Sequence, residues 1–196
     1  MKKVILTLIL GIISLSHQAQ SFQKNDLILS LGLGQSIFST VDLSKYEKLP
    51  SFHSTFLQPI TFKGEFAITD EIGLGLSSVY SAATASWTDS LSYSYKSSFN
   101  KLSITPRLNI HFLRKKMVDM YIGGGIGYKT GEYRLSGNNP NFLDYFSLGV
   151  IPISLEASLG IRAYITPEFG GFAELGIGHG YFQFGLAYKP LVNTRN

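Results

Sequence analysis

The chain has 196 residues, of which 44% are hydrophobic and 15% are charged. This length suits a single domain, and so low a share of charged residues is unusual for the surface of a soluble protein. The sequence contains no cysteine, which excludes disulfides, thiolate chemistry, cysteine zinc sites and a lipidated cysteine.

The first 20 residues have the layout of a secretory signal peptide. Two lysines precede an apolar run over residues 4–15, and small and polar residues follow. Because this run is too short to span a bilayer comfortably, we predict a signal peptide over 1–20, cleaved near Ala19 or Gln20, and a single domain over 21–196. The alternative is a retained N-terminal anchor helix. The formal net charge is +4, and residues 1–20 hold two lysines and no acid, so the remaining chain carries +2. A chain so nearly neutral predicts no nucleic-acid partner.

The rest of the chain alternates apolar residues with polar or small ones at period two. Such alternation predicts β-strands that have two different faces. The alternating stretches are 27–34, 60–69, 72–77, 102–112, 120–127, 153–165, 169–178 and 181–189. No convincing helical pattern follows the signal peptide, so the sequence predicts about eight strands.

The connections between these stretches alternate in length. The short ones are "TDE" at 69–71, "LRKKM" at 113–117 and "TPE" at 166–168, and the long ones are 36–58, 82–100 and 131–150. Short turns at one end and long loops at the other are typical of a transmembrane β-barrel, with the turns in the periplasm and the loops outside the cell.

The stretch "ISLEASLGIRAYI" at 153–165 shows which face meets lipid. Its odd positions are all apolar, and its even positions carry Glu156 and Arg162. In a soluble, lipocalin-like barrel the second face would meet water and be rich in Lys and Glu, whereas in this chain it is mostly glycine and serine. A charge on the lipid face would cost roughly 2–4 kcal/mol at mid-membrane. The sequence therefore predicts an all-β fold, an eight-stranded antiparallel up-and-down transmembrane β-barrel with its apolar face outward.

Charged residues on the inward face are predicted to form a structural polar network in the lumen. Its members are Lys63, Glu65, Arg107, Glu156, Arg162, Glu174 and Gln183. Counted from the short turns, most of them lie at a similar depth. Arg162 and Glu174 are equidistant from Glu168, so we predict that they are cross-strand neighbours joined by a salt bridge. An isolated charge in a dry lumen would be costly, so we interpret this pair as mutual compensation rather than as a gain in stability. A packed structural plug is favoured over a proton relay or a gate.

Aromatic residues in two of the long connections are predicted to lie at the outer rim. They are Trp87, Tyr93, Tyr95, Phe142, Tyr145 and Phe146. We favour a girdle at the lipid border over a ligand cradle. Aromatic residues stand at odd positions up to Tyr95, whereas the following strand is apolar at even positions. This change predicts a bulge or a true loop between them.

The last strands carry a resemblance to a known family. The segment "SLGIRAYITPEFGGFAELGIG" and the later "FQFGLAYKP" resemble the last three strands of the small outer-membrane β-barrel domain proteins of Gram-negative bacteria, and the similarity extends over 25–190. It implies an eight-stranded barrel of the kind of the OmpA membrane domain or OmpX, inserted in outer-membrane lipid by the barrel assembly machinery. Such proteins usually end on an aromatic residue, whereas this chain continues past Tyr188 as "KPLVNTRN".

The remaining motifs predict no catalytic, cofactor or metal site. The "GGGIG" at 123–127 lies in a predicted strand with no following helix, and no two of the four histidines have metal-ligand spacing. His179 and Ser81 could lie close together at the outer rim, but no acid is placed to orient the histidine. We therefore predict no enzyme, but a monomeric structural or interaction barrel in the outer membrane, for adhesion or docking, with a side-chain-filled lumen. The alternative is a narrow pore or a conduit for small hydrophobic molecules, and an outer-membrane hydrolase is third. The sequence does not identify the partner of the loops.

Overall fold

The computed structural model describes residues 21–35, 50–140, 146–149, 151–178 and 180–190. In this part the regular secondary structure consists of strands alone, and no helix there is long and apolar enough to cross a membrane. The strands are β1 (Leu27–Gln35), β2 (His53–Ala67), β3 (Ile72–Thr88), β4 (Ser94–Arg114), β5 (Val118–Gly137), β6 (Phe146–Gly149), β7 (Ile153–Tyr164), β8 (Phe169–Ile177) and β9 (Phe182–Tyr188).

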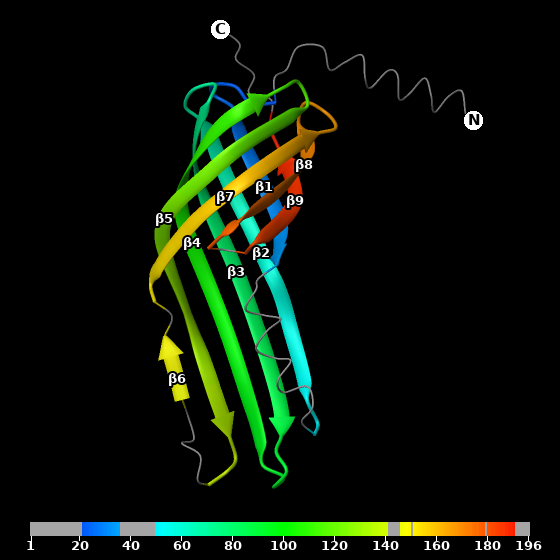
Figure 1. Ribbon diagram of the computed structural model, residues 1–196, viewed down its shortest axis with the longest axis vertical. Coiled ribbons are helices and arrows are strands. Elements are labelled where there is room, and N and C mark those ends of the chain that lie inside the picture. The colour runs from blue at the N-terminus through cyan, green and yellow to red at the C-terminus, as the bar shows by residue number, and fades with distance from the viewer. Residues whose placement is uncertain (1–20, 36–49, 141–145, 150, 179, 191–196) are drawn as a thin grey trace, which may run out of the picture.

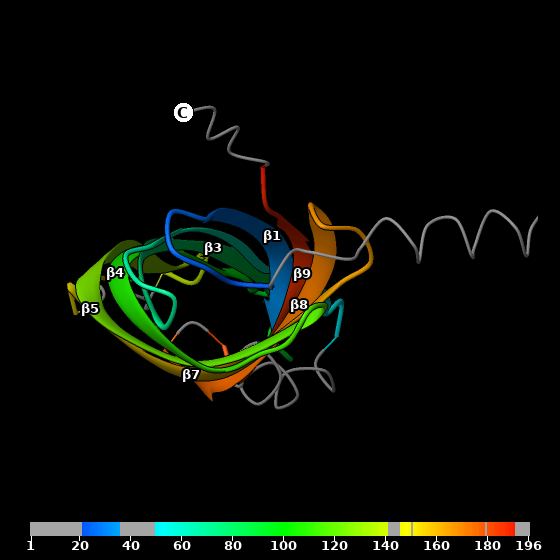
Figure 2. The ribbon, with the colours of Figure 1, turned by 90° about the horizontal axis from the view of Figure 1, so that it is seen from above.

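Eight of these strands close into an antiparallel barrel (Figures 1 and 2). Each strand pairs with the next along the ring, β1 pairs with β9, and the pairings β4–β5 and β5–β7 complete the ring. The short β6 pairs only with Glu132–Leu135 of β5 and lies outside the ring. The predicted eight-stranded up-and-down barrel is therefore confirmed, with β6 as a ninth strand that the sequence pattern did not indicate.

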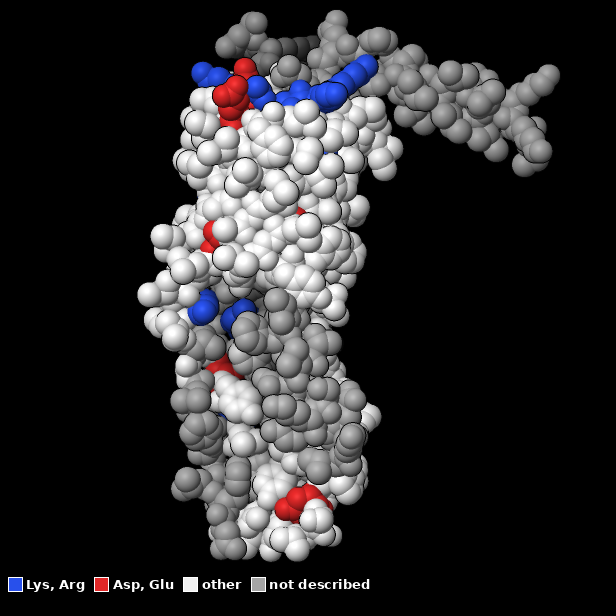
Figure 3. Space-filling view, in the orientation of Figure 1, with Lys and Arg blue, Asp and Glu red and all other residues white. Residues whose placement is uncertain are grey.

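The outer face of the barrel is apolar and the inner face is polar. In β7, every second residue is buried, so that Glu156 and Arg162 are 6% and 4% exposed while Leu159 between them is 46% exposed. Figure 3 shows a largely uncharged surface below a row of charged residues at the end that carries the short turns, which we call the turn end. So large an exposed apolar surface is unfavourable in water. We therefore place this face against the hydrocarbon of a bilayer.

Exposed aromatic side chains mark both borders of the apolar band. They are Tyr80, Tyr128 and Tyr181 toward the opposite, loop end, and Phe66, Phe112, Phe169 and Tyr188 toward the turn end. Aromatic girdles at both membrane interfaces are typical of transmembrane barrels. Tyr188, which is the last residue of β9, packs its ring against Phe169 with 4.6 Å between the ring centroids.

Strands β2 to β5 extend beyond the loop end of the barrel as a sheet (Figure 1). We call this part the protruding sheet; it comprises 53–57, 82–88, 94–101 and 129–137. The predicted connections 82–100 and 131–150 therefore need correction. Strand pairing continues through most of 82–100 and as far as Gly137, so the link between β3 and β4 is only 89–93. The first predicted connection, 36–58, likewise ends at His53, where β2 begins.

The polarity change that predicted a bulge or loop in β4 has another cause. The pairing of β3 with β4 runs from Ile72↔Ile110 to Thr88↔Ser94 without a shift, so odd residues face inward throughout. What changes is the outward face, which carries Leu102 and Ile104 beside the band but Lys96 in the protruding sheet. Since water replaces lipid there, polar residues take over the outer face. The register shifts lie elsewhere, between Leu57 and Ile60 and between His111 and Leu113.

Candidate functional site

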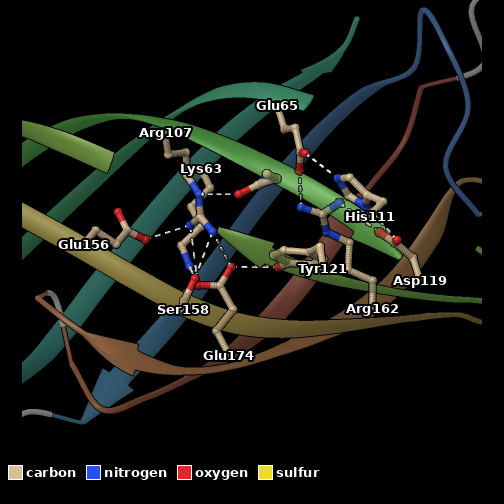
Figure 4. Close-up of polar contacts among 11 residues, drawn as sticks. Lys63, Glu65, Arg107, His111, Asp119, Tyr121, Glu156, Ser158, Arg162 and Glu174 are labelled. Carbon is tan, nitrogen blue, oxygen red and sulfur yellow. Dashed lines mark hydrogen bonds and ion pairs between the residues drawn. The ribbon is translucent and has the colours of Figure 1, made fainter. Parts of the chain in front are cut away.

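The lumen contains two clusters of buried ion pairs (Figure 4). The first, the lysine cluster, joins Lys63 of β2, Arg107 of β4, Glu156 and Ser158 of β7, and Glu174 of β8. Lys63 Nζ lies 2.5 Å from Glu174 Oε2. Arg107 Nη1 lies 2.8 Å from Glu156 Oε1, and Arg107 Nη2 lies 3.3 Å from Glu174 Oε1. Arg107 also donates to Ser158 Oγ at 3.1 Å. These contacts connect side chains across the lumen.

The second group, the histidine cluster, lies nearer the turn end. It consists of Glu65 of β2, His111 of β4, Asp119 of β5 and Arg162 of β7. His111 Nε2 lies 2.8 Å from Glu65 Oε1, and His111 Nδ1 lies 2.7 Å from Asp119 Oδ1. Arg162 donates to Glu65 and, at 3.2 Å, to Asp119 Oδ2. Every member is at least 95% buried.

Hydrogen bonding and charge balance both favour an extra proton at His111. A neutral imidazole has one donor and one acceptor nitrogen, but here both nitrogens face carboxylate oxygens. In the two clusters together, the carboxylates of Glu65, Asp119, Glu156 and Glu174 face the cations of Lys63, Arg107 and Arg162. An imidazolium at His111 supplies the missing positive charge. Buried charges that are matched in this way avoid much of the cost of an unpaired ion.

Tyr121 of β5 connects the two clusters. Its hydroxyl donates to Glu174 Oε1 at 2.7 Å, and the Arg162 guanidinium lies 4.3 Å from the centre of its ring. The ring fits because Gly160 lies opposite, where a Cβ would come within 2.3 Å of the tyrosine Cζ. Gly123 makes room in the same way for Arg107, whose Nη2 would lie 2.3 Å from an added Cβ. At these positions, glycines on the inward face accommodate large polar side chains.

All seven residues predicted for the lumen network are buried on the inward face. Six of them form the ion pairs described above, whereas Gln183 lies opposite Glu174 on β9, and its Oε1 has no hydrogen-bond partner in the described part of the chain. The prediction that most of them lie at a similar depth was too simple, because the charges separate into two clusters.

The predicted salt bridge between Arg162 and Glu174 is wrong. Arg162 pairs with Phe172, and Glu174 pairs with Gly160. The hairpin is closed by a hydrogen bond from Ile165 N to Phe169 O, so the turn is centred one residue earlier than the sequence count assumed. Both charges stay on the inward face, because a shift of two in the pairing preserves the alternation. Each then takes partners from across the lumen.

Sequence reasoning missed the roles of His111, Asp119 and Tyr121. His111 and Tyr121 stood on the inward face of their predicted strands, but the histidine was considered only as a metal ligand. Asp119 lies one residue into β5, just after the β4–β5 turn, and only the structure shows that it reaches the lumen. Across the described residues, no group of three or more His, Asp or Glu side chains could hold a metal ion.

Two of the six aromatic residues predicted for the outer rim lie on the inward face of the protruding sheet. Trp87 and Tyr95 are direct cross-strand partners on the inward face, with stacked rings 5.8 Å apart. The girdle interpretation therefore does not apply to these two. Tyr93 is half-buried in the short link after β3. Phe142 and Tyr145 are outside the described residues, as is His179, and for Phe146 only the backbone in β6 is described.

Two lysines share this inward face at the base of the protruding sheet. Lys101 of β4 and Lys129 of β5 are both half-buried and stand in diagonal register, because Lys129 pairs with Ser103 and Lys101 with Gly131. They repel one another electrostatically, and no carboxylate of the described residues forms a salt bridge with either. Above them, Ser97 donates to the hydroxyl of Tyr133 at 3.1 Å.

Comparison with known proteins gives structural relatives only. No family model matches the chain, and no curated protein matches its sequence. Ail, the attachment invasion locus protein of Yersinia pestis, in complex with the heparin analogue sucrose octasulfate, is similar with a TM-score of 0.53 and 14% identity, covering 85% of this chain and 99% of that one. Another crystal structure of Ail has a TM-score of 0.49 and 15% identity, and the match covers the same shares of the two chains. The N-terminal β-barrel domain of Pseudomonas aeruginosa OprF has a TM-score of 0.45 and 14% identity, and the match covers 86% of this chain and 99% of that one. The resemblance in the last strands is thus confirmed at the level of fold, which is that of the small eight-stranded outer-membrane barrels.

Proposed function

We propose that this chain is a monomeric outer-membrane barrel that serves in docking or adhesion and presents the protruding sheet outside the cell. The observation that carries the proposal is the height of the sheet. Strands β3, β4 and β5 are 17, 21 and 20 residues long, whereas β7, β8 and β9 have 12, 9 and 7. A barrel needs only about 9–11 residues per strand to cross the membrane. The additional length places structured, partly aromatic surface beyond the lipid.

The chemistry of the inward face of this sheet suits an anionic saccharide. Lys101 and Lys129 lack acidic partners among the described residues, so a sulfate or phosphate would relieve their mutual repulsion. Both lysines point away from lipid, which favours a ligand from outside the cell over a headgroup of the surrounding membrane. The structure of Ail with sucrose octasulfate supports the choice of a sulfated sugar as the probe.

The proposal is tested by titrating sucrose octasulfate into the folded protein in detergent. We expect binding, and we expect the double variant Lys101→Gln and Lys129→Gln to weaken it by about tenfold or more, because a hydrogen bond to a charged group contributes roughly 1.5–3 kcal/mol. Lys96→Gln, on the outward face of β4, is the matched control and leaves binding unchanged. Absence of binding to the parent protein, or equal loss in the control, would contradict the proposed site.

A closed lumen is part of the same proposal. The ion pairs from β2, β4, β5, β7 and β8 cross the interior in two consecutive clusters, which supports a barrel that does not conduct. Eight strands also leave an interior just wide enough for side chains. In planar bilayers the protein should give no steady single-channel openings. Steady openings would favour the narrow pore instead.

A further inference from the structure

We propose that residues 21–26, the N-terminal plug, close the turn end of the lumen and control the access of water to the histidine cluster. Phe22 is 0% exposed and Ser21 is 2% exposed, although both precede the first strand. The ring of Phe22 stacks on His111, with 3.5 Å between the centroids and 10° between the planes. This inference concerns the end of the barrel opposite the protruding sheet and does not depend on the proposed docking role.

The backbone of the plug is held on two sides of the barrel. At the β4–β5 turn, Ser21 Oγ donates to Val118 O at 3.0 Å, and Ser21 N donates to Lys115 O at 3.3 Å. At the end of β2, Asn25 N donates to Ala67 O, and Ala67 N donates to Asp26 O, both at 2.9 Å. These contacts span the mouth of the barrel, so the segment lies across the opening.

A turn before β1, and not an alternating strand pattern, directs Phe22 inward. Asn25 has a φ of 71°, in the left-handed region that asparagine tolerates better than most residues. This turn precedes β1 and is closed by hydrogen bonds between Gln23 and Asp26. Asp26 is in turn paired with Lys189, 3.2 Å away, just after the last strand.

Phe22 seals the histidine cluster with apolar surface. It packs in a buried group with Ile28, Ala67 and Ala187, which belong to β1 and β2 and to the end of β9. A ring stacked on a charged imidazole also gains attraction between the cation and the π-system. If water replaced the ring, the higher local dielectric would weaken the ion pairs of His111 with Glu65 and Asp119. Plug and network therefore stabilise one another.

A cysteine placed beneath the plug tests this inference, since the natural chain has no cysteine. Ala67→Cys puts a thiol at a position that is 0% exposed, and Lys116→Cys provides an exposed reference in the β4–β5 turn. We expect a water-soluble methanethiosulfonate reagent to label Cys at 67 at least about tenfold more slowly than Cys at 116, because labelling then requires local opening. Adding Phe22→Ala should raise the rate at 67 to that of the reference.

The matched control is Gln23→Ala, next to Phe22, with a half-buried side chain. It should leave the labelling rate unchanged. The inference is overturned if Cys at 67 reacts as fast as Cys at 116 while the N-terminal plug is intact, and equally if it stays protected after Phe22→Ala in protein that still shows the heat-dependent gel shift of a folded barrel. The first comparison needs no change at Phe22, so it decides the question even if Phe22→Ala does not fold.

Discussion

Replacing Arg162 with methionine should lower the free energy of unfolding by about 3–5 kcal/mol, the usual cost of breaking a buried ion pair from one side. The guanidinium is 4% exposed and bonds to both Glu65 and Asp119. Its removal leaves the carboxylates of the two clusters with one cation too few. Urea unfolding in detergent micelles, followed by circular dichroism and by the heat-dependent gel shift, measures the loss.

Two further variants separate the effect of burial from the effect of charge. Arg114→Met removes an ion pair with Glu71, 3.0 Å away, whose side chains are 24% and 66% exposed, and a hydrogen bond to Asp70 O. It should lower the free energy of unfolding by less than about 1 kcal/mol, because exposed ion pairs contribute little. Adding Glu65→Gln to Arg162→Met restores the charge balance, so the double variant should be more stable than Arg162→Met alone. Equal losses for Arg114→Met and Arg162→Met would show that the network contributes nothing specific.

Ile122→Arg should lower the free energy of unfolding by about 2–4 kcal/mol, because a charge on the lipid face at the middle of the membrane is unfavourable. Ile122 is 58% exposed and lies on the outward face of β5, in register with Ile110 and Leu159. The same urea titration measures the change. The matched control is Thr130→Arg, eight positions along the same outward face at the border of the protruding sheet. There the cost should fall to roughly 0–1 kcal/mol. Equal costs at the two positions would show that both meet the same solvent.

The sequence predicted which side chains face the lumen, but not which of them touch. Period two is a local property, so "SLEASLGIR" is enough to place Glu156 and Arg162 inward. Their partners depend on how the ring closes. Lys63 and Glu174 are 111 positions apart, and nothing in the pattern of either strand indicates the contact. A miscount of the turn by one residue was then sufficient to give Arg162 the wrong partner.

The strand ends and the N-terminal plug were missed for related reasons. The alternation of apolar and polar residues ends near Asn100, where the outer face becomes polar, so the sequence pattern places the end of the strand there. Pairing continues beyond that point, because backbone hydrogen bonds depend on the neighbouring strand rather than on the solvent. Phe22 follows no strand pattern at all, and its burial depends on the turn at Asn25 and on the fit against His111.

The contact of the outer face with lipid is tested most directly by fluorescence quenching in liposomes. Single variants Ile122→Cys and Lys96→Cys, both on outward faces, would each carry a bimane label. We expect brominated lipid to quench the label at 122 and aqueous iodide to leave it unaffected, with the opposite result at 96. Quenching of the label at 122 by iodide, and not by brominated lipid, would mean that water covers the apolar face and would contradict the membrane assignment.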